Sequence, residues 1–97
     1  MTAPIRRLVL DVLKPHQPDI VEFTRAVADH ASVDAVNAVL VETDREVETV
    51  KLTIRGAAVD ASATEDAIDT LGGSIHSIDE VVCGEALTEQ SPTPQDR

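Results

Sequence analysis

The sequence contains very few aromatic residues. Phe23 is the single aromatic residue among 97, and tryptophan and tyrosine are absent, although 42% of the residues are hydrophobic. A core must therefore be built from valine, isoleucine, leucine and alanine, which bury less area per side chain than aromatic rings do. A small chain also buries a smaller fraction of its surface than a large one. We expect one small domain that gains further burial by oligomerisation.

Cysteine is nearly absent as well. The single Cys83 cannot form a disulfide within the chain, and no second thiol completes a CxxC pair for zinc or redox chemistry. Free cysteine usually packs as a small hydrophobic residue. We therefore predict that Cys83 is buried and structural.

Positively charged residues are few as well. The chain has eight basic and 18 acidic residues, which gives a net charge of -10. This charge opposes binding to nucleic-acid phosphates and to anionic lipids, so we expect neither as a partner. The acidic residues are spread along the chain, and only Lys14 and Lys51 are lysines. Molar salt screens such self-repulsion, because the Debye length falls to about 3 Å at 1 M. The pattern is typical of a halophilic, salt-rich cytosol.

Long apolar runs are also missing. The run at residues 8–10 follows two arginines but is broken by Asp11, and it is too short for a signal peptide. No segment approaches the roughly 20 apolar residues that cross a bilayer. We expect a cytoplasmic protein.

Four segments have the patterns of strands. Residues 5–13 alternate, with Leu8, Leu10 and Val12 on one face and Arg7, Val9, Asp11 and Leu13 on the other. Residues 33–43 and 74–82 are rich in β-branched side chains, and residues 50–56 alternate between apolar and polar ones. The polar residues 44–46 predict a hairpin between the second and third strands.

Two segments between the strands predict helices. The first has Pro18 as its first helical residue, followed by apolar residues at spacings of three and four, namely Ile20, Phe23, Val27 and Ala31. The second starts at Ser62, which forms a capping box with Glu65, and runs to residue 71. Gly72 and Gly73 then supply a left-handed helix end.

The element order β-α-β-β-α-β predicts an α+β fold, a ferredoxin-like sandwich. Its four-stranded antiparallel sheet has the strand order 4-1-3-2, with both helices on one face and the other face open. We assign residues 1–86 to this domain. Residues 87–97 are rich in proline and polar residues and form a C-terminal tail.

Three stretches resemble an archaeal family known as domain of unknown function 211. They are LDVLKPHQP at residues 10–18, VKLTIRG at 50–56 and LGGSIHSIDEVVCG at 71–84, with TPQDR at the end. The resemblance covers nearly the whole chain. It implies a ferredoxin-like fold in a closed homo-oligomer, a ring, and it implies no reaction, since the role of the family is itself unknown.

The predicted topology brings polar side chains to one end of the sheet. His76 at the start of the fourth strand should lie near Lys14 and His16 at the end of the first, beside the hairpin carboxylates of Asp44, Glu46 and Glu48. Imidazoles suit zinc or nickel, and carboxylates suit calcium or magnesium. We predict His16, His76, Asp44 and Glu46 as metal ligands, and Lys14, His16 and His76 as ligand-binding residues. The alternative is a set of solvated turn residues.

Asp11 is a further ligand-binding candidate. It shares the open sheet face with Arg7, Lys51 and Arg55, so its surroundings are cationic. Such a carboxylate can act as a general base or form an ion pair that a neighbouring subunit buries. We favour the ion pair, because nearby cations move a carboxyl pKa away from the neutral range that a base needs.

These features favour a binding module over an enzyme. We expect a homo-oligomer that binds a small ligand or a divalent metal ion at a subunit interface. One alternative is a small metal-dependent enzyme with His16 and His76 as ligands and Asp11 or Glu46 as base. Another is an acidic scaffold that docks a partner protein through the TPQDR tail.

Overall fold

The computed structural model describes residues 2–30 and 32–85, so the predicted tail at 87–97 lies outside the described residues. Its elements follow the predicted order: β1 (Ile5–Pro15), α1 (Ile20–Ala28), β2 (Ala35–Thr43), β3 (Val47–Arg55), α2 (Ala61–Thr70) and β4 (Ser74–Cys83). The third strand begins three residues earlier than its alternation predicts, and residues 44–46 connect it to the second strand, as predicted for the hairpin.

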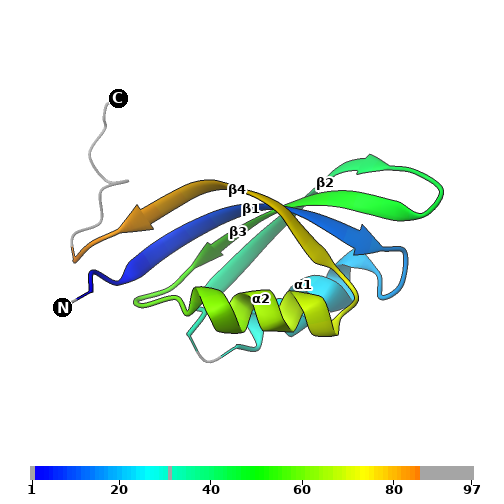
Figure 1. Cartoon of the computed structure of the whole chain (residues 1–97). Helices are drawn as coiled ribbons and strands as arrows, with labels where there is room; N and C mark the ends of the chain where they lie inside the picture. Colours follow the sequence, from blue (N-terminus) through cyan, green and yellow to red (C-terminus); the bar gives the residue numbers. More distant parts are fainter. Residues whose placement is uncertain (1, 31, 86–97) are drawn as a thin grey trace.

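The sheet has the strand order β2-β3-β1-β4, and each neighbouring pair is antiparallel. Both helices lie on one side of the sheet, and the β2–β3 hairpin extends beyond them (Figure 1). The predicted ferredoxin-like α+β fold and its strand order are therefore confirmed. The helix-free face is the open face of the sheet.

The core lies between the sheet and the helices. Alternate residues of the two central strands face it, namely Leu8, Leu10 and Val12 from β1 and Val50, Leu52 and Ile54 from β3. Phe23 and Val27 of α1 and Ile68 of α2 fill the space above them. The faces predicted from the alternation in β1 are confirmed.

Both helices begin at an aspartate. The carboxylate of Asp19 accepts a hydrogen bond from the Glu22 amide at 2.9 Å, and that of Asp60 accepts one from the Ala63 amide at 3.0 Å. The predictions of Pro18 as the first helical residue and of a capping box at Ser62 are therefore wrong. Aspartate caps a helix as well as serine does, and each aspartate lies where the chain leaves its extended conformation.

The predicted helix end is confirmed at Gly72, whose φ of 86° lies in the left-handed region. The burial predicted for Cys83 is wrong, because this thiol is exposed. Cys83 ends the edge strand β4 and pairs with Ile5 at the end of the sheet. Position in the sheet therefore overrides the usual preference of cysteine for the interior.

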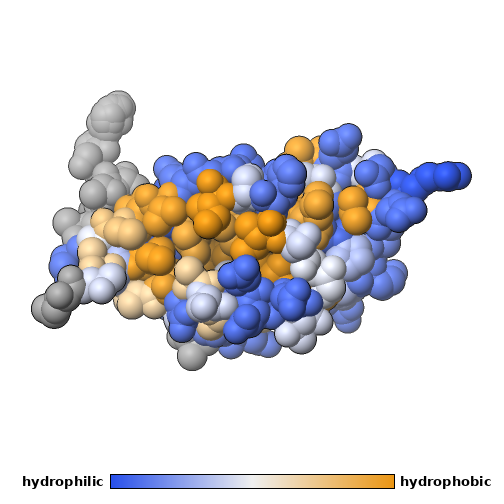
Figure 2. Space-filling view, in the orientation of Figure 1, coloured by the Kyte–Doolittle hydropathy of each residue, from blue (hydrophilic) through white to orange (hydrophobic). Residues whose placement is uncertain are grey.

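The two edge strands expose large apolar side chains. Val39, Leu40 and Val41 of β2 and Ile78 and Val81 of β4 are between 48% and 61% exposed. Figure 2 shows apolar side chains gathered along β4 and towards α2. Within residues 2–30 and 32–85, neither helix is long and apolar enough to cross a membrane.

Candidate functional site

Lys14 is a fully buried lysine at the end of β1. It follows Leu8, Leu10 and Val12 on the alternating face of β1, so the strand directs it into the core. Its Nζ lies 5.9 Å from the centroid of the Phe23 ring and donates a hydrogen bond of 2.7 Å to the Pro15 carbonyl oxygen. A buried ammonium needs a counter-charge, because burial strips its hydration.

Glu48 supplies that counter-charge. It is the cross-strand partner of Lys14 in the β1–β3 ladder, and its Oε1 lies 2.8 Å from the Lys14 Nζ. The hydrogen bond from Lys14 is the main reason that the pKa of Glu48 lies below its ordinary value of 4.5, and the nearby His16 adds to the shift. Glu48 is therefore held as a carboxylate at the edge of the core.

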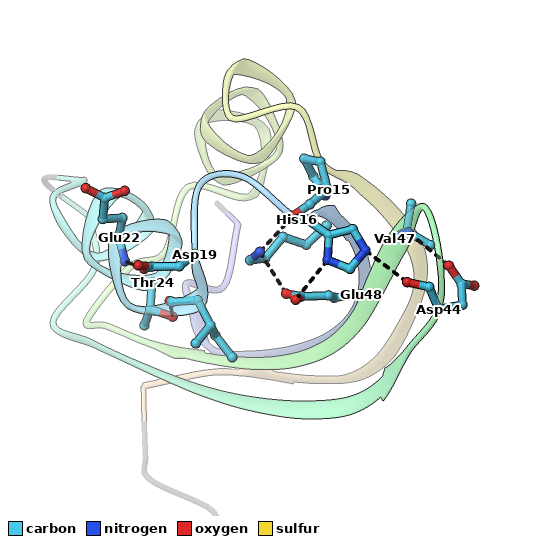
Figure 3. A network of polar contacts seen from close by, with 10 residues as sticks. Pro15, His16, Asp19, Glu22, Thr24, Asp44, Val47 and Glu48 are labelled. Carbon is cyan, nitrogen blue, oxygen red and sulfur yellow. Dashed lines mark hydrogen bonds and ion pairs between the residues drawn. The ribbon is translucent and has the colours of Figure 1, made fainter.

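His16 connects this ion pair to the surface. Its Nε2 donates a hydrogen bond of 2.9 Å to the Asp44 carbonyl oxygen, and its Nδ1 lies 3.3 Å from Oε2 of Glu48. Figure 3 shows the imidazole between the hairpin and the Glu48 carboxylate. The side chain remains 42% exposed, so part of the ring is accessible to solvent.

Asp44 shapes the hairpin beside His16. Its carboxylate accepts hydrogen bonds from the backbone amides of Val47 at 3.0 Å and Glu46 at 2.9 Å. These bonds, led by the one from Val47, hold the pKa of Asp44 below its ordinary 3.8. We call Lys14, His16, Asp44 and Glu48 the hairpin cluster.

The hairpin cluster contains three of the predicted site residues, but in different roles. A fully buried side chain cannot reach a ligand at the surface, so Lys14 supports the site from inside instead of facing a ligand as predicted. His16 and Asp44 lie together at the surface. Glu48, rather than Glu46, provides the carboxylate that joins them to the core.

The four predicted metal ligands do not meet in one subunit. His76 lies on β4, at the opposite edge of the sheet from the hairpin, and is exposed. Across the described part of the chain, no three histidine, cysteine, aspartate or glutamate side chains are close enough to share a metal ion. A complete ligand set from His16, His76, Asp44 and Glu46 would need a second subunit.

Asp11 lies on the open face among ion pairs. Its cross-strand partner on β3 is Lys51, but the Lys51 Nζ lies 3.3 Å from Oδ2 of Asp79 on β4. The Ser77 hydroxyl, which donates to Asp79 at 2.8 Å, and Lys51 together lower the pKa of Asp79. Lys51 lies beside Asp11, whereas Arg7 and Arg55 are cross-strand neighbours of each other four residues further along the strands. The ion pair of Asp11 stays a prediction.

The hairpin cluster makes stability depend on pH in a defined direction. Glu48 and Asp44 have lowered pKa values in the folded protein. As the pH falls, these two carboxylates therefore become protonated in the unfolded chain before they do in the folded protein. Their contribution to stability is full above their ordinary pKa values and is lost as the pH falls from about 4.5 through the lowered values.

We expect the free energy of unfolding to fall over this pH range more steeply in the wild type than in a variant with both Lys14 and Glu48 changed to methionine. Urea titrations between pH 6 and pH 3 in 1 M potassium chloride would measure this difference, because molar salt screens the remaining charges. Equal slopes for the two proteins would contradict the prediction.

Comparisons with known proteins place the chain in an uncharacterised group. The pattern of domain of unknown function 211, described as uncharacterised ArCR, matches residues 6–97. The uncharacterised protein MJ0319 of Methanocaldococcus jannaschii is 47% identical over 93 residues, which cover 96% of each chain.

Proposed function

This chain belongs to the family of domain of unknown function 211, and from that premise we propose that it is a binding module that assembles head to tail through its sheet edges. A small ligand or a divalent metal ion then lies at each subunit interface. The observation that carries this proposal is the pair of apolar edges on one small sheet.

The two edges are suited to each other. β2 and β4 each have one side without a neighbouring strand in the described sheet, and each exposes large aliphatic side chains there. Natural proteins usually protect such edges with charges or prolines, because unpaired strands associate. Pairing β2 of one copy with β4 of the next would satisfy the backbone groups and bury the aliphatic side chains.

The directions of the strands determine which ends of β2 and β4 would lie side by side in the assembly. In the sheet, β2 runs parallel to β1 and therefore antiparallel to β4. A second copy that extends the same sheet would place its β4 antiparallel to β2, as required for a regular ladder. The start of that β4 would then lie beside the hairpin end of β2.

This arrangement would bring His76 of the next subunit to His16, Asp44 and Glu46. Within one subunit, His16, Asp44 and Glu46 lie at the hairpin and His76 lies on the edge strand β4. Head-to-tail pairing would bring β4 of the next subunit to the hairpin. Two imidazoles with carboxylates form a donor set that suits zinc or nickel. A ring of subunits would carry one such site at every interface.

Native mass spectrometry in ammonium acetate, with zinc or nickel added, tests the proposal. We expect a closed oligomer with one metal ion per subunit. His76→Ala should abolish metal retention and leave the oligomer intact, whereas His30→Ala, which removes a histidine outside the site, should retain the metal. A monomer, or a His76→Ala oligomer that still holds one metal ion per subunit, would overturn the assignment.

A further inference from the structure

Two arginines stand directly opposite each other on the open face. Arg7 of β1 and Arg55 of β3 are cross-strand partners in the antiparallel ladder. Like charges in this position are destabilising unless something neutralises them. The chain has eight basic and 18 acidic residues, so an acidic residue would be the expected neighbour of an arginine, and two adjacent arginines are unexpected.

The arginines border a hollow of about 370 Å³ that spans β1, β3 and β2. The lining residues are Arg7, Ala35, Val36, Asn37, Thr53 and Arg55. Ala35 is the cross-strand partner of Arg55, and Asn37 is the partner of Thr53. The short side chain of Ala35 leaves room beside the Arg55 guanidinium, while Asn37 and Thr53 add an amide and a hydroxyl.

The charge in this hollow is not balanced from within it. None of the six lining residues is acidic. On the side towards β4, the Arg7 Nε lies 3.3 Å from Oε1 of Glu80, but this buried Nε has no partner in hydrogen-bond geometry. Within residues 2–30 and 32–85, Arg55 takes part in no ion pair. Glu80 therefore offsets part of one positive charge, and the second remains.

We propose that this hollow binds a small oxyanion, the phosphate or carboxylate group of a small metabolite. Guanidinium groups bind both through paired N–H···O hydrogen bonds, and an anion between Arg7 and Arg55 would remove their repulsion. Thr53 and Asn37 donate further hydrogen bonds from the adjacent row of the sheet. The volume is at the lower end of the range for small-molecule sites.

The site lies at the opposite end of the sheet from the hairpin cluster, so it does not rest on the proposed metal site. Isothermal titration calorimetry with inorganic phosphate, and separately with acetate, tests it in potassium chloride that contains a metal chelator. We expect saturable binding, and a loss of affinity of at least about ten-fold in Arg55→Gln. Arg25→Gln, the same charge change on α1, should bind as the wild type does.

Thermal unfolding distinguishes a role of Arg55 in anion binding from a role in the stability of the fold. Without the anion, Arg55→Gln should be at least as stable as the wild type, because it removes the repulsion with Arg7. Binding of phosphate alone identifies a phosphorylated ligand, and binding of acetate identifies a carboxylate. Binding of neither anion, or equal affinity in Arg55→Gln and Arg25→Gln, would overturn the proposal.

Discussion

Replacing Glu48 by methionine is expected to lower the melting temperature by more than about 10 °C. The reason is Lys14, whose ammonium is fully buried and would keep the Pro15 carbonyl oxygen as its hydrogen-bond partner but lose its counter-charge. Removing one member of a buried ion pair leaves the other charged and without hydration, which is the costly outcome. The melting temperature should be measured by circular dichroism at one protein concentration, because oligomerisation also affects it.

Replacing the other member of the ion pair, Lys14, should lower the melting temperature much less. In Lys14→Met, a side chain of similar shape stays beside Phe23, and the Glu48 carboxylate, which is 19% exposed, keeps contact with His16 and solvent. Changing both residues to methionine should restore most of the stability lost in Glu48→Met, since aliphatic groups often replace a buried ion pair without loss. Additive effects of the two substitutions would show that the pair is not coupled.

Lysine at either sheet edge is expected to convert the proposed head-to-tail oligomer to monomers. Val41→Lys places a charge on β2, and Ile78→Lys places one on β4, where the wild-type side chains are 58% and 61% exposed. Head-to-tail assembly uses both edges in every contact, so either substitution alone should break it. Sedimentation velocity in molar salt would measure the effect. Val21→Lys on α1, at a residue that is 57% exposed, is the matched control.

Mixing the two edge variants gives a sharper test. The Val41→Lys protein retains an intact β4 edge, and the Ile78→Lys protein retains an intact β2 edge. Together they should form heterodimers through the one interface that remains whole, and no larger species. If subunits instead met through identical edges, one of the two variants would keep its contacts, and mixing would produce no heterodimer.

Several features of this protein could be predicted from the sequence because they depend on local pattern. The alternation in β1 places Leu8, Leu10 and Val12 in the core, and the order of elements allows few topologies. The left-handed glycine at Gly72 follows from the same local physics. The two helix starts were predicted wrongly, because Asp19 follows Pro18 and Asp60 precedes Ser62 closely, and each aspartate caps its helix instead.

The candidate site was only partly predictable. The topology placed His16 near Asp44, since the end of β1 must lie beside the hairpin, and the structure joins them by a hydrogen bond. The role of Glu48 depends on the register, which pairs it with Lys14. A signal existed, because Lys14 continues the core face of β1, and Glu48 precedes Val50 by two residues in β3.

The sequence by itself determined the alternating faces, the order of the elements and the chemical groups available at each end of the sheet, because these follow from periodicity and chain connectivity. Only the tertiary structure decided that Lys14 is buried, that Cys83 is exposed, and that Arg7 stands opposite Arg55. These outcomes depend on strand register and on which strands form the edges. Both are set by packing between segments far apart in the chain.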